Sequence, residues 1–255
     1  MHPKRQNAHG IYLTGIRDGQ PRQAMATHTG ARYRQHSTGV PDGKEGFIAF
    51  FDEFVQRHPQ RDIRIVRSWV DGPLVFVQAY QDLDHGQARW ATLDFFATDA
   101  DDRVIEHWDV IVAHTDQTPS GHSSIDGPTE IEDLPQTEAN RQRVRDLFAQ
   151  ALIPGAADRL ADYVSPTTLV QHSLTQPDGF AAFQALTTGP AARLRYRELV
   201  LLAGQGNFVA TLAKADYDGQ PYAQADIFRL ADGRVVERWE AGEPVPAQPV
   251  NSGKF

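Results

Sequence analysis

The chain has 255 residues, no cysteine and a formal net charge of −8 at pH 7, with 40% hydrophobic and 23% charged residues. This composition is typical of a globular protein of one large or two ordinary domains. It excludes disulfides, thiolate nucleophiles and cysteine-bound zinc. The acidic balance and scattered arginines argue against a nucleic-acid surface. No run approaches the ~18 apolar residues of a membrane span, and the first residues lack an apolar signal-peptide core. We therefore expect a cytoplasmic protein without nucleic-acid or membrane partners.

The first part of the chain predicts helices followed by an antiparallel meander. Gly10 and Gly15 weaken the first helix, whereas Asp42 or Gly43 begins a strong phenylalanine-rich helix that Pro59 ends. Turn signals separate the later strands. The predicted elements are helices over 5–19, 21–27 and 44–57, a short strand over 31–36, and strands over 62–70, 74–81, 88–98 and 104–113.

Residues 116–136 are rich in Ser, Thr, Pro, Gly and acidic residues, a composition typical of a linker. The alternative is an ordered excursion anchored by Ile125, Ile131 and Leu134. The sequence leaves both interpretations open.

The second part of the chain predicts the same order of elements. These are helices over 138–152, from 154 onward and over 178–186, a short strand over 167–172, and strands over 193–202, 207–217, 222–230 and 234–240. The proline-rich stretch 246–255 is predicted to be an extended tail.

Short motifs recur about 130 residues apart. VIEHWDV (104–110) returns as VVERWEA (235–241), and Gln35-His36 returns as Gln171-His172 before a Pro-Asp-Gly turn. A chain that repeats its motifs in the same order is expected to fold the same unit twice. We therefore predict domains over 1–115 and 137–245, joined by a linker over 116–136 and followed by a tail over 246–255.

Two of the repeated stretches carry a family resemblance. ARYRQHSTGVPDGKEGFIAFF (31–51) and DFFATDADDRVIEHWDVIVAH (94–114) resemble the SnoaL-like polyketide cyclase family of the nuclear transport factor 2-like (NTF2-like) superfamily. The resemblance covers 31–114 well and 138–241 more loosely. It implies two tandem cone-shaped α+β barrels, in which helices pack on a curved antiparallel sheet, arranged as a pseudo-dimer within one chain. The superfamily also contains steroid isomerases, epoxide hydrolases, dehydratases and binding-only domains, so the fold does not decide the reaction.

The resemblance also implies a chemistry. In this family a carboxylate or histidine in an apolar cone moves a proton next to a carbonyl, and neither a metal nor a cofactor is required. The expected ligand is a small apolar carbonyl-containing molecule. The candidate catalytic residues are Asp94, His36 and His107 in the first unit and Asp226 and His172 in the second. The second unit departs from the first because His107 is replaced there by Arg238. If that position contacts substrate, the two pockets cannot do identical work.

Strand alternation supports a role for the aspartates. It places Asp94 and Asp226 among large aromatic neighbours, and apolar surroundings raise a carboxyl pKa into the range useful for general acid/base catalysis. Asp109 shares a strand face with His107 and is a second-rank carboxylate. The candidate substrate-binding residues are Trp90, Phe96, Phe47, Phe51, Trp108, Tyr222, Phe228, Trp239 and Arg238.

Structural interpretations of the same residues stay open. A strand aspartate can face solvent, a buried histidine can simply bond backbone, and Trp108 and Trp239 can be core aromatics. The function is therefore either a cyclase or isomerase or a non-catalytic binding or association module, with further homo-oligomers allowed. An enzyme requires an enclosed cavity with an acid or base on it, whereas a scaffold would fill its cone with its own side chains.

Overall fold

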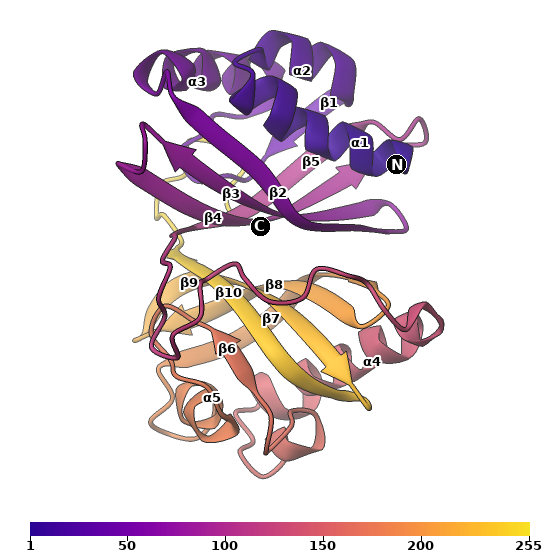
Figure 1. Ribbon diagram of the computed structural model, residues 1–255, viewed down its shortest axis with the longest axis vertical. Helices are drawn as coiled ribbons and strands as arrows, with labels where there is room; N and C mark the ends of the chain where they lie inside the picture. The colour runs from indigo at the N-terminus through magenta and orange to yellow at the C-terminus, as the bar shows by residue number, and fades with distance from the viewer. The chain divides into compact units, whose positions relative to one another are not determined.

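The computed structural model describes residues 1–255, which form two compact units. The first unit comprises Met1–Ala113 with Pro246–Phe255, and the second comprises His114–Val245. Each unit is a five-stranded sheet with helices on one face (Figure 1). The prediction of two α+β units of the same plan is confirmed, while the association of the two sheets with one another stays a prediction.

The first unit follows the predicted order of elements. It contains α1 (Pro3–Gly10), the π-helix η1 (Ile11–Arg17), α2 (Pro21–His28), β1 (Thr29–Gln35), α3 (Gly43–Arg57), β2 (Arg61–Asp71), β3 (Leu74–Leu83), β4 (Ala88–Thr98) and β5 (Val104–Ala113). The sheet order is β1-β5-β4-β3-β2. Strand β1 pairs with β5 in parallel and the other pairs are antiparallel.

Local sequence explains how this unit begins its helices. Gly10 lies so close to α2 that a Cβ there would come 2.2 Å from His28 Nε2, so a larger residue would force the His28 ring to move. Asp42 caps α3 by accepting hydrogen bonds from the Gly43 and Gln35 backbone nitrogens at 3.1 and 2.8 Å. The same carboxylate therefore fixes the helix start and the end of β1.

The second unit repeats the plan with shorter helices. It contains η2 (Leu134–Gln136), α4 (Thr137–Leu147), the π-helix η3 (Phe148–Leu152), the 3-10 turn η4 (Leu160–Asp162), β6 (Val170–His172), α5 (Phe180–Thr187), β7 (Leu194–Gln205), β8 (Phe208–Tyr217), β9 (Gln220–Ala231) and β10 (Arg234–Pro244). The sheet order is β6-β10-β9-β8-β7, with β6 parallel to β10. The helix predicted from residue 154 is reduced to η4, because Gly155 adopts a φ of +68° that ends any helix there.

Two segments outside the repeats are also ordered. Residues 114–133 lie on the second unit, where Ile125 is buried and the Asp126 carbonyl accepts the Trp239 indole N–H at 2.8 Å. Residues 246–255 lie on the first unit and bury Lys254. Residues 114–133 thus form the ordered excursion rather than a free linker, and residues 246–255 form a docked segment rather than an extended tail. The predicted domain boundaries stay predictions. No helix is long and apolar enough to cross a membrane.

Candidate functional site

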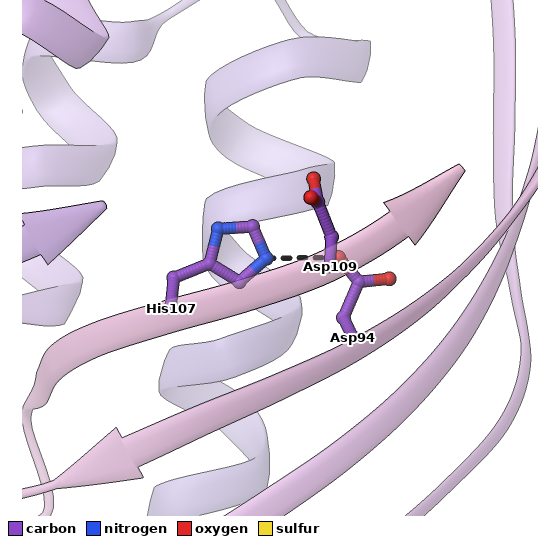
Figure 2. Close-up of side chains that lie close together, drawn as sticks. All are labelled: Asp94, His107 and Asp109. Atoms are coloured by element: carbon purple, nitrogen blue, oxygen red, sulfur yellow. Dashed lines mark hydrogen bonds and ion pairs between the residues drawn. The ribbon is translucent and has the colours of Figure 1, made fainter. Parts of the chain in front are cut away.

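Three titratable side chains meet inside the first unit. His107 and Asp109 project from the same face of β5, and Asp94 projects from the neighbouring β4 (Figure 2). The antiparallel register pairs Asp94 with Asp109, which explains the convergence because directly opposite residues share a face. The three side chains are buried, with Asp94 completely inaccessible.

Asp94 is surrounded by hydrogen-bond donors. Its Oδ1 accepts from the Tyr12 hydroxyl at 2.7 Å and faces His107 Nε2 at 2.9 Å. Its Oδ2 accepts from the Thr92 hydroxyl at 2.7 Å. Burial raises the pKa of Asp94 above its usual value, and the hydrogen bond and charge of His107 only partly oppose that effect.

His107 has one engaged nitrogen and one that is not. The Asp94 carboxylate can only accept, so whenever the ring is neutral this contact favours the tautomer with the proton on Nε2. Nδ1 is buried and has no hydrogen-bond partner in the protein. The ring stacks on Phe96 with centroids 4.3 Å apart and planes 5° apart. The imidazole is thus held in one orientation with an unused lone pair on Nδ1.

A cavity of about 360 Å³ lies against this cluster. His107 and Asp109 line it, whereas Asp94 lies behind His107 and is not among the lining residues. The other polar lining groups include Tyr12, Gln35, Ser37 and Thr38. The aromatic part of the wall consists of Phe47, Phe50, Phe51, Phe54 and Trp90.

The structure places the predicted substrate-binding residues of this unit in three different locations. Phe47, Phe51 and Trp90 lie on the cavity wall. Phe96 supports the His107 ring from the core. Trp108 points to the other face of the sheet and stacks on His36 with centroids 4.9 Å apart.

His36 lies outside the cavity wall and does not contact Asp94. Its Nδ1 donates to the Gly253 carbonyl, and its Nε2 lies 2.9 Å from Glu106 Oε1. We therefore reassign His36 from a candidate catalytic residue to an anchor of the segment 246–255.

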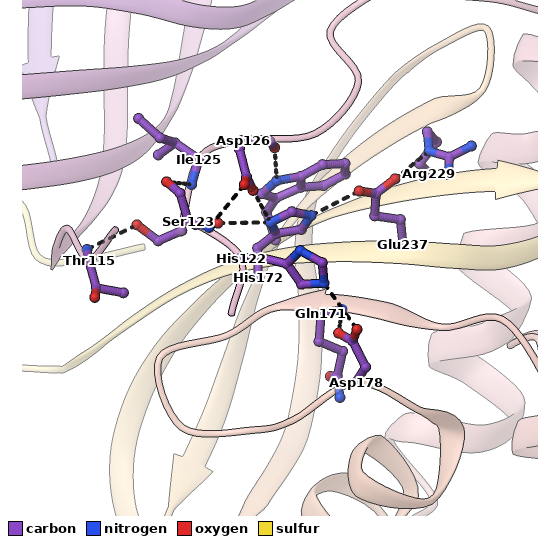
Figure 3. Close-up of polar contacts among 12 residues, drawn as sticks. Thr115, His122, Ser123, Ile125, Asp126, Gln171, His172, Asp178, Arg229 and Glu237 are labelled. Atoms are coloured by element: carbon purple, nitrogen blue, oxygen red, sulfur yellow. Dashed lines mark hydrogen bonds and ion pairs between the residues drawn. The ribbon is translucent and has the colours of Figure 1, made fainter. Parts of the chain in front are cut away.

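His172 makes the matching contacts in the second unit (Figure 3). Its Nδ1 donates to the Ser123 carbonyl at 2.8 Å and its Nε2 lies 2.8 Å from Glu237 Oε1. The ring stacks on Trp239 with centroids 4.6 Å apart. The repeated Gln-His and Glu-x-Trp motifs thus build the same anchor twice. In each unit it holds a segment from outside the repeat, so we reassign His172 in the same way.

Asp226 occupies the place of Asp94 in the second unit, but its partners differ. It accepts hydrogen bonds from the Tyr196 hydroxyl at 2.8 Å, Gln224 Nε2 at 3.0 Å and Arg238 Nε at 2.9 Å. Arg238 also pairs with Glu240 at 2.6 Å. Burial lowers the pKa of Arg238, but the two carboxylates outweigh it and hold the pKa above its usual value. The guanidinium therefore stays charged and neutralises both acids.

Apolar side chains surround this ion-paired network. Arg238 lies over the Phe183 ring, 4.9 Å from its centroid, and Phe228 is fully buried in the core. Tyr222 stacks on Tyr217 with centroids 5.2 Å apart. The second unit thus joins Asp226 to Arg238 and uses its other predicted binding residues, Tyr222, Phe228 and Trp239, in packing.

Three residues of the first-unit cluster were not among the predicted site residues, although strand alternation places Thr92 on the same face as Asp94. Tyr12 and Thr92 bond Asp94 and also each other, at 2.9 Å. Lys254 brings Nζ to 3.3 Å from Asp109 Oδ1. Tyr12 had a weak signal, as a hydroxyl within an otherwise apolar helix stripe. Lys254 had none, because it lies 145 residues from Asp109 in the chain.

The cluster also has the residue types of a cation site. Asp94, His107 and Asp109 each offer a ligand atom, and these atoms lie within 4.8 Å of one another. Asp94 Oδ1, however, already faces two donors, and Asp109 faces the Lys254 ammonium. A divalent cation would have to displace these partners and lie beside a lysine, so the residues do not fit a resident metal.

No protein-family model matches the chain, and no curated protein sequence matches it. The structure is similar to a protein of Bacillus cereus ATCC 10987 provisionally described as a polyketide cyclase, at 18% identity and a TM-score of 0.38, over 43% of this chain and 74% of that one. It is similar to a SnoaL-like polyketide cyclase, also provisionally described, from Jannaschia sp. CCS1, at 21% identity and a TM-score of 0.37, over 43% and 85%. It is also similar to a protein of Kribbella flavida DSM 17836 provisionally described as a ketosteroid isomerase, at 15% identity and a TM-score of 0.38, over 45% and 84%. Each match covers less than half of this chain, and none decides the function.

Proposed function

We propose that the first unit is a small-molecule enzyme that moves a proton next to a carbonyl group, with His107 as the acid/base. The observation that carries this proposal is the buried Nδ1 of His107, which has no protein partner and belongs to a residue of the cavity wall. A buried polar atom without a partner costs about 1–3 kcal/mol. A bound substrate that places a proton against Nδ1 would offset the free-energy cost of leaving this atom without a partner.

Within this proposal each member of the cluster has a different task. Asp94 holds the Nε2–H of His107 and so keeps the lone pair on Nδ1. Nδ1 takes the proton from the carbon beside the substrate carbonyl, which leaves an enolate. In an isomerisation the proton returns to a second carbon of the enolate; in an aldol cyclisation the enolate carbon attacks a second carbonyl and the proton goes to the resulting alkoxide. The positive charge that the ring acquires is stabilised by the carboxylates of Asp94 and Asp109. Asp94 is thus a positioning residue, and this role replaces the direct proton transfer expected from the sequence.

The lining supports a small apolar carbonyl compound as substrate. Four phenylalanines of α3 and Trp90 present apolar ring faces, which favour a flat or polycyclic molecule. The polar lining groups are His107, Asp109, Tyr12, Gln35, Ser37 and Thr38, together with Arg57, His58 and Gln81. Aldol-type cyclisation and double-bond isomerisation both need only this arrangement, because each begins with removal of a proton next to a carbonyl.

The second unit is proposed to be a structural partner without the same activity. Arg238 stands where the first unit has His107, and its guanidinium is paired with Asp226 and Glu240. Arginine does not release a proton at physiological pH. A non-catalytic binding module would share the cavity of the first unit but would not need an unpartnered imidazole nitrogen.

The test begins with small enolisable carbonyl compounds, screened for thermal stabilisation of the protein. Stabilising compounds are then followed by NMR in D₂O for deuterium uptake beside the carbonyl. Wild type should catalyse the exchange, and His107→Gln should slow it roughly 10²–10⁴-fold, the usual contribution of a general acid/base. Exchange no faster with wild type than without protein would leave the binding-module alternative, and equal catalysed exchange by the two proteins would remove His107 as the acid/base.

A further inference from the structure

Residues 246–255 are bonded to the loop that follows β1. Asn251 Nδ2 donates to the Ser37 and Val40 carbonyls at 2.7 and 2.8 Å. The His36 ring donates to the Gly253 carbonyl, and the Ser252 hydroxyl donates to Asp42. These hydrogen bonds hold the segment in one defined position on the loop.

The loop that binds this segment adjoins the cavity. Ser37, Thr38 and Val40 are cavity-lining residues, and they lie in the loop that Asn251 bonds. Gly253 has a φ of +90°, a conformation that side chains rarely allow. The turn at Gly253 is followed at once by Lys254, which passes from the surface into the cluster.

Lys254 is almost fully buried, with 4% of its surface exposed. Its Nζ lies 3.3 Å from Asp109 Oδ1 and 3.4 Å from Thr38 Oγ1. Lysine is rarely buried unless it is paired, because its charge loses hydration. Asp109 is also buried, so each of the two charges is stabilised by the other.

We propose that Lys254 is a positioning residue of the site: its ammonium group keeps the Asp109 carboxylate ionised on the cavity wall, two residues along β5 from His107. This inference rests on the proposed function for its meaning in catalysis. The charged pair itself does not depend on that function.

The groups around Asp109 support this assignment. The Asp109 carboxyl group interacts through charge or hydrogen bonds with Lys254, His107, the Ser37 hydroxyl, Asp94, Tyr12 and Tyr33. Burial raises the pKa of Asp109, but the charges of Lys254 and His107 and the hydrogen bonds from Ser37 and Lys254 hold it below its usual value. Without Lys254, burial and the neighbouring Asp94 carboxyl would favour a protonated Asp109.

An anionic Asp109 has a task that a neutral one cannot perform. When His107 accepts the substrate proton, the ring becomes positive in a low-dielectric site where a nearby negative charge is effective. A protonated Asp109 would give only a hydrogen bond. Loss of Lys254 should therefore lower turnover more than it weakens substrate binding.

The experiment compares wild type with Lys254→Met and Lys254→Arg. The pKa of the Asp109 carboxyl group is measured by ¹³C NMR titration, with Asp109→Asn used to assign its signal. We expect the pKa of Asp109 to rise in Lys254→Met and to stay low in Lys254→Arg. With a substrate in hand, kcat should fall roughly 10–100-fold in Lys254→Met, as for other charged groups that orient catalytic residues, with KM changed little, and Lys254→Arg should restore most of it.

The titration requires no substrate, so it separates the two proposals. An unchanged pKa of Asp109 in folded Lys254→Met would overturn the role of Lys254 and leave His107 as the acid/base. A raised pKa without any substrate turnover in wild type would support the pair and count against the proposed function. If Lys254→Met does not fold, Lys254→Gln replaces it, because the amide keeps a polar group beside Thr38.

Discussion

His107 Nε2 lies 2.9 Å from Asp94 Oδ1, and the opposite nitrogen of the same ring is buried without a protein partner. The carboxylate therefore determines which nitrogen carries the proton and which presents a lone pair. In the second unit the matching aspartate binds an arginine, and no such lone pair exists. The replacement of His107 by Arg238 is thus the main difference between the first cluster and the ion-paired core of the second unit.

Asp94→Asn should lower turnover roughly 10²–10⁴-fold, because an amide cannot stabilise the positive imidazole ring. Stability should change little or rise at neutral pH, where the buried carboxylate is a cost. Since burial raises the folded-state pKa of Asp94, the ionised group destabilises the fold above the unfolded pKa of about 3.9. The advantage of the variant should therefore disappear as pH falls below that value.

Thermal unfolding of both proteins from acid to neutral pH checks this expectation. Thr92→Val is the matched control, since it removes one hydrogen bond to Asp94 but keeps the charge. An Asp94→Asn variant with wild-type turnover would remove Asp94 from the mechanism.

Asp109→Asn should destabilise the protein by about 3–5 kcal/mol, the usual effect of removing one partner of a buried ion pair. Asp109 and Lys254 are both more than nine-tenths buried, so the remaining ammonium would be left without a counter-charge. The double variant Asp109→Asn/Lys254→Met should recover much of the loss. Urea unfolding of the single and double variants measures the coupling, and strictly additive losses would contradict it.

The same pair has a defined pH dependence. The folded-state pKa of Asp109 is held below its usual value, so the group adds stability above the unfolded pKa of about 3.9. That contribution is lost as pH falls through the folded pKa. The difference in the free energy of unfolding between wild type and the double variant should therefore decrease on acidification. A constant difference from neutral to acid pH would refute the assignment.

Arg238→Met should also destabilise by about 3–5 kcal/mol, because Asp226 and Glu240 would lose the guanidinium that compensates their charges. The control is Arg145→Met, which removes a partly exposed ion pair with Glu138 worth about 0–1 kcal/mol. Denaturant unfolding compares the two. A loss no greater for Arg238→Met than for Arg145→Met would show that the second core does not depend on its ion pairs.

His36→Phe and His172→Phe test the paired anchors. Phenylalanine can retain the stack on Trp108 or Trp239 but not the hydrogen bonds. Hydrogen exchange should increase in 246–255 for the first variant and in 114–133 for the second. Only His36→Phe should lower turnover, since only its segment carries Lys254; equal effects of both variants on turnover would contradict this.

The repeat made the fold largely predictable. The strands of both sheets lie within a few residues of their predicted ranges, because turn residues and apolar alternation mark them directly. The helix predictions were less accurate. Residues 11–17 and 148–152 form π-helices, and hydrophobic spacing does not distinguish a π-helix from an α-helix.

The site was predicted only in part. Asp94 and His107 were candidates because of the family resemblance of the repeated motifs, and strand alternation supported Asp94 and placed Asp109 on the face of His107. The roles of His36 and His172 depend on Gly253 and Ser123 carbonyls, and backbone acceptors leave no trace in a sequence. Lys254 likewise needs a segment whose docking depends on tertiary hydrogen bonds rather than on periodicity.

The central claim is that the neutral His107 ring carries its proton on Nε2 and keeps the Nδ1 lone pair available to accept a substrate proton. Long-range ¹H–¹⁵N NMR of wild type, with His107→Gln used for assignment, reports the tautomer directly. The account predicts the Nε2–H tautomer in wild type and a mixture of tautomers in Asp94→Asn. An Nδ1–H tautomer in wild type would contradict it.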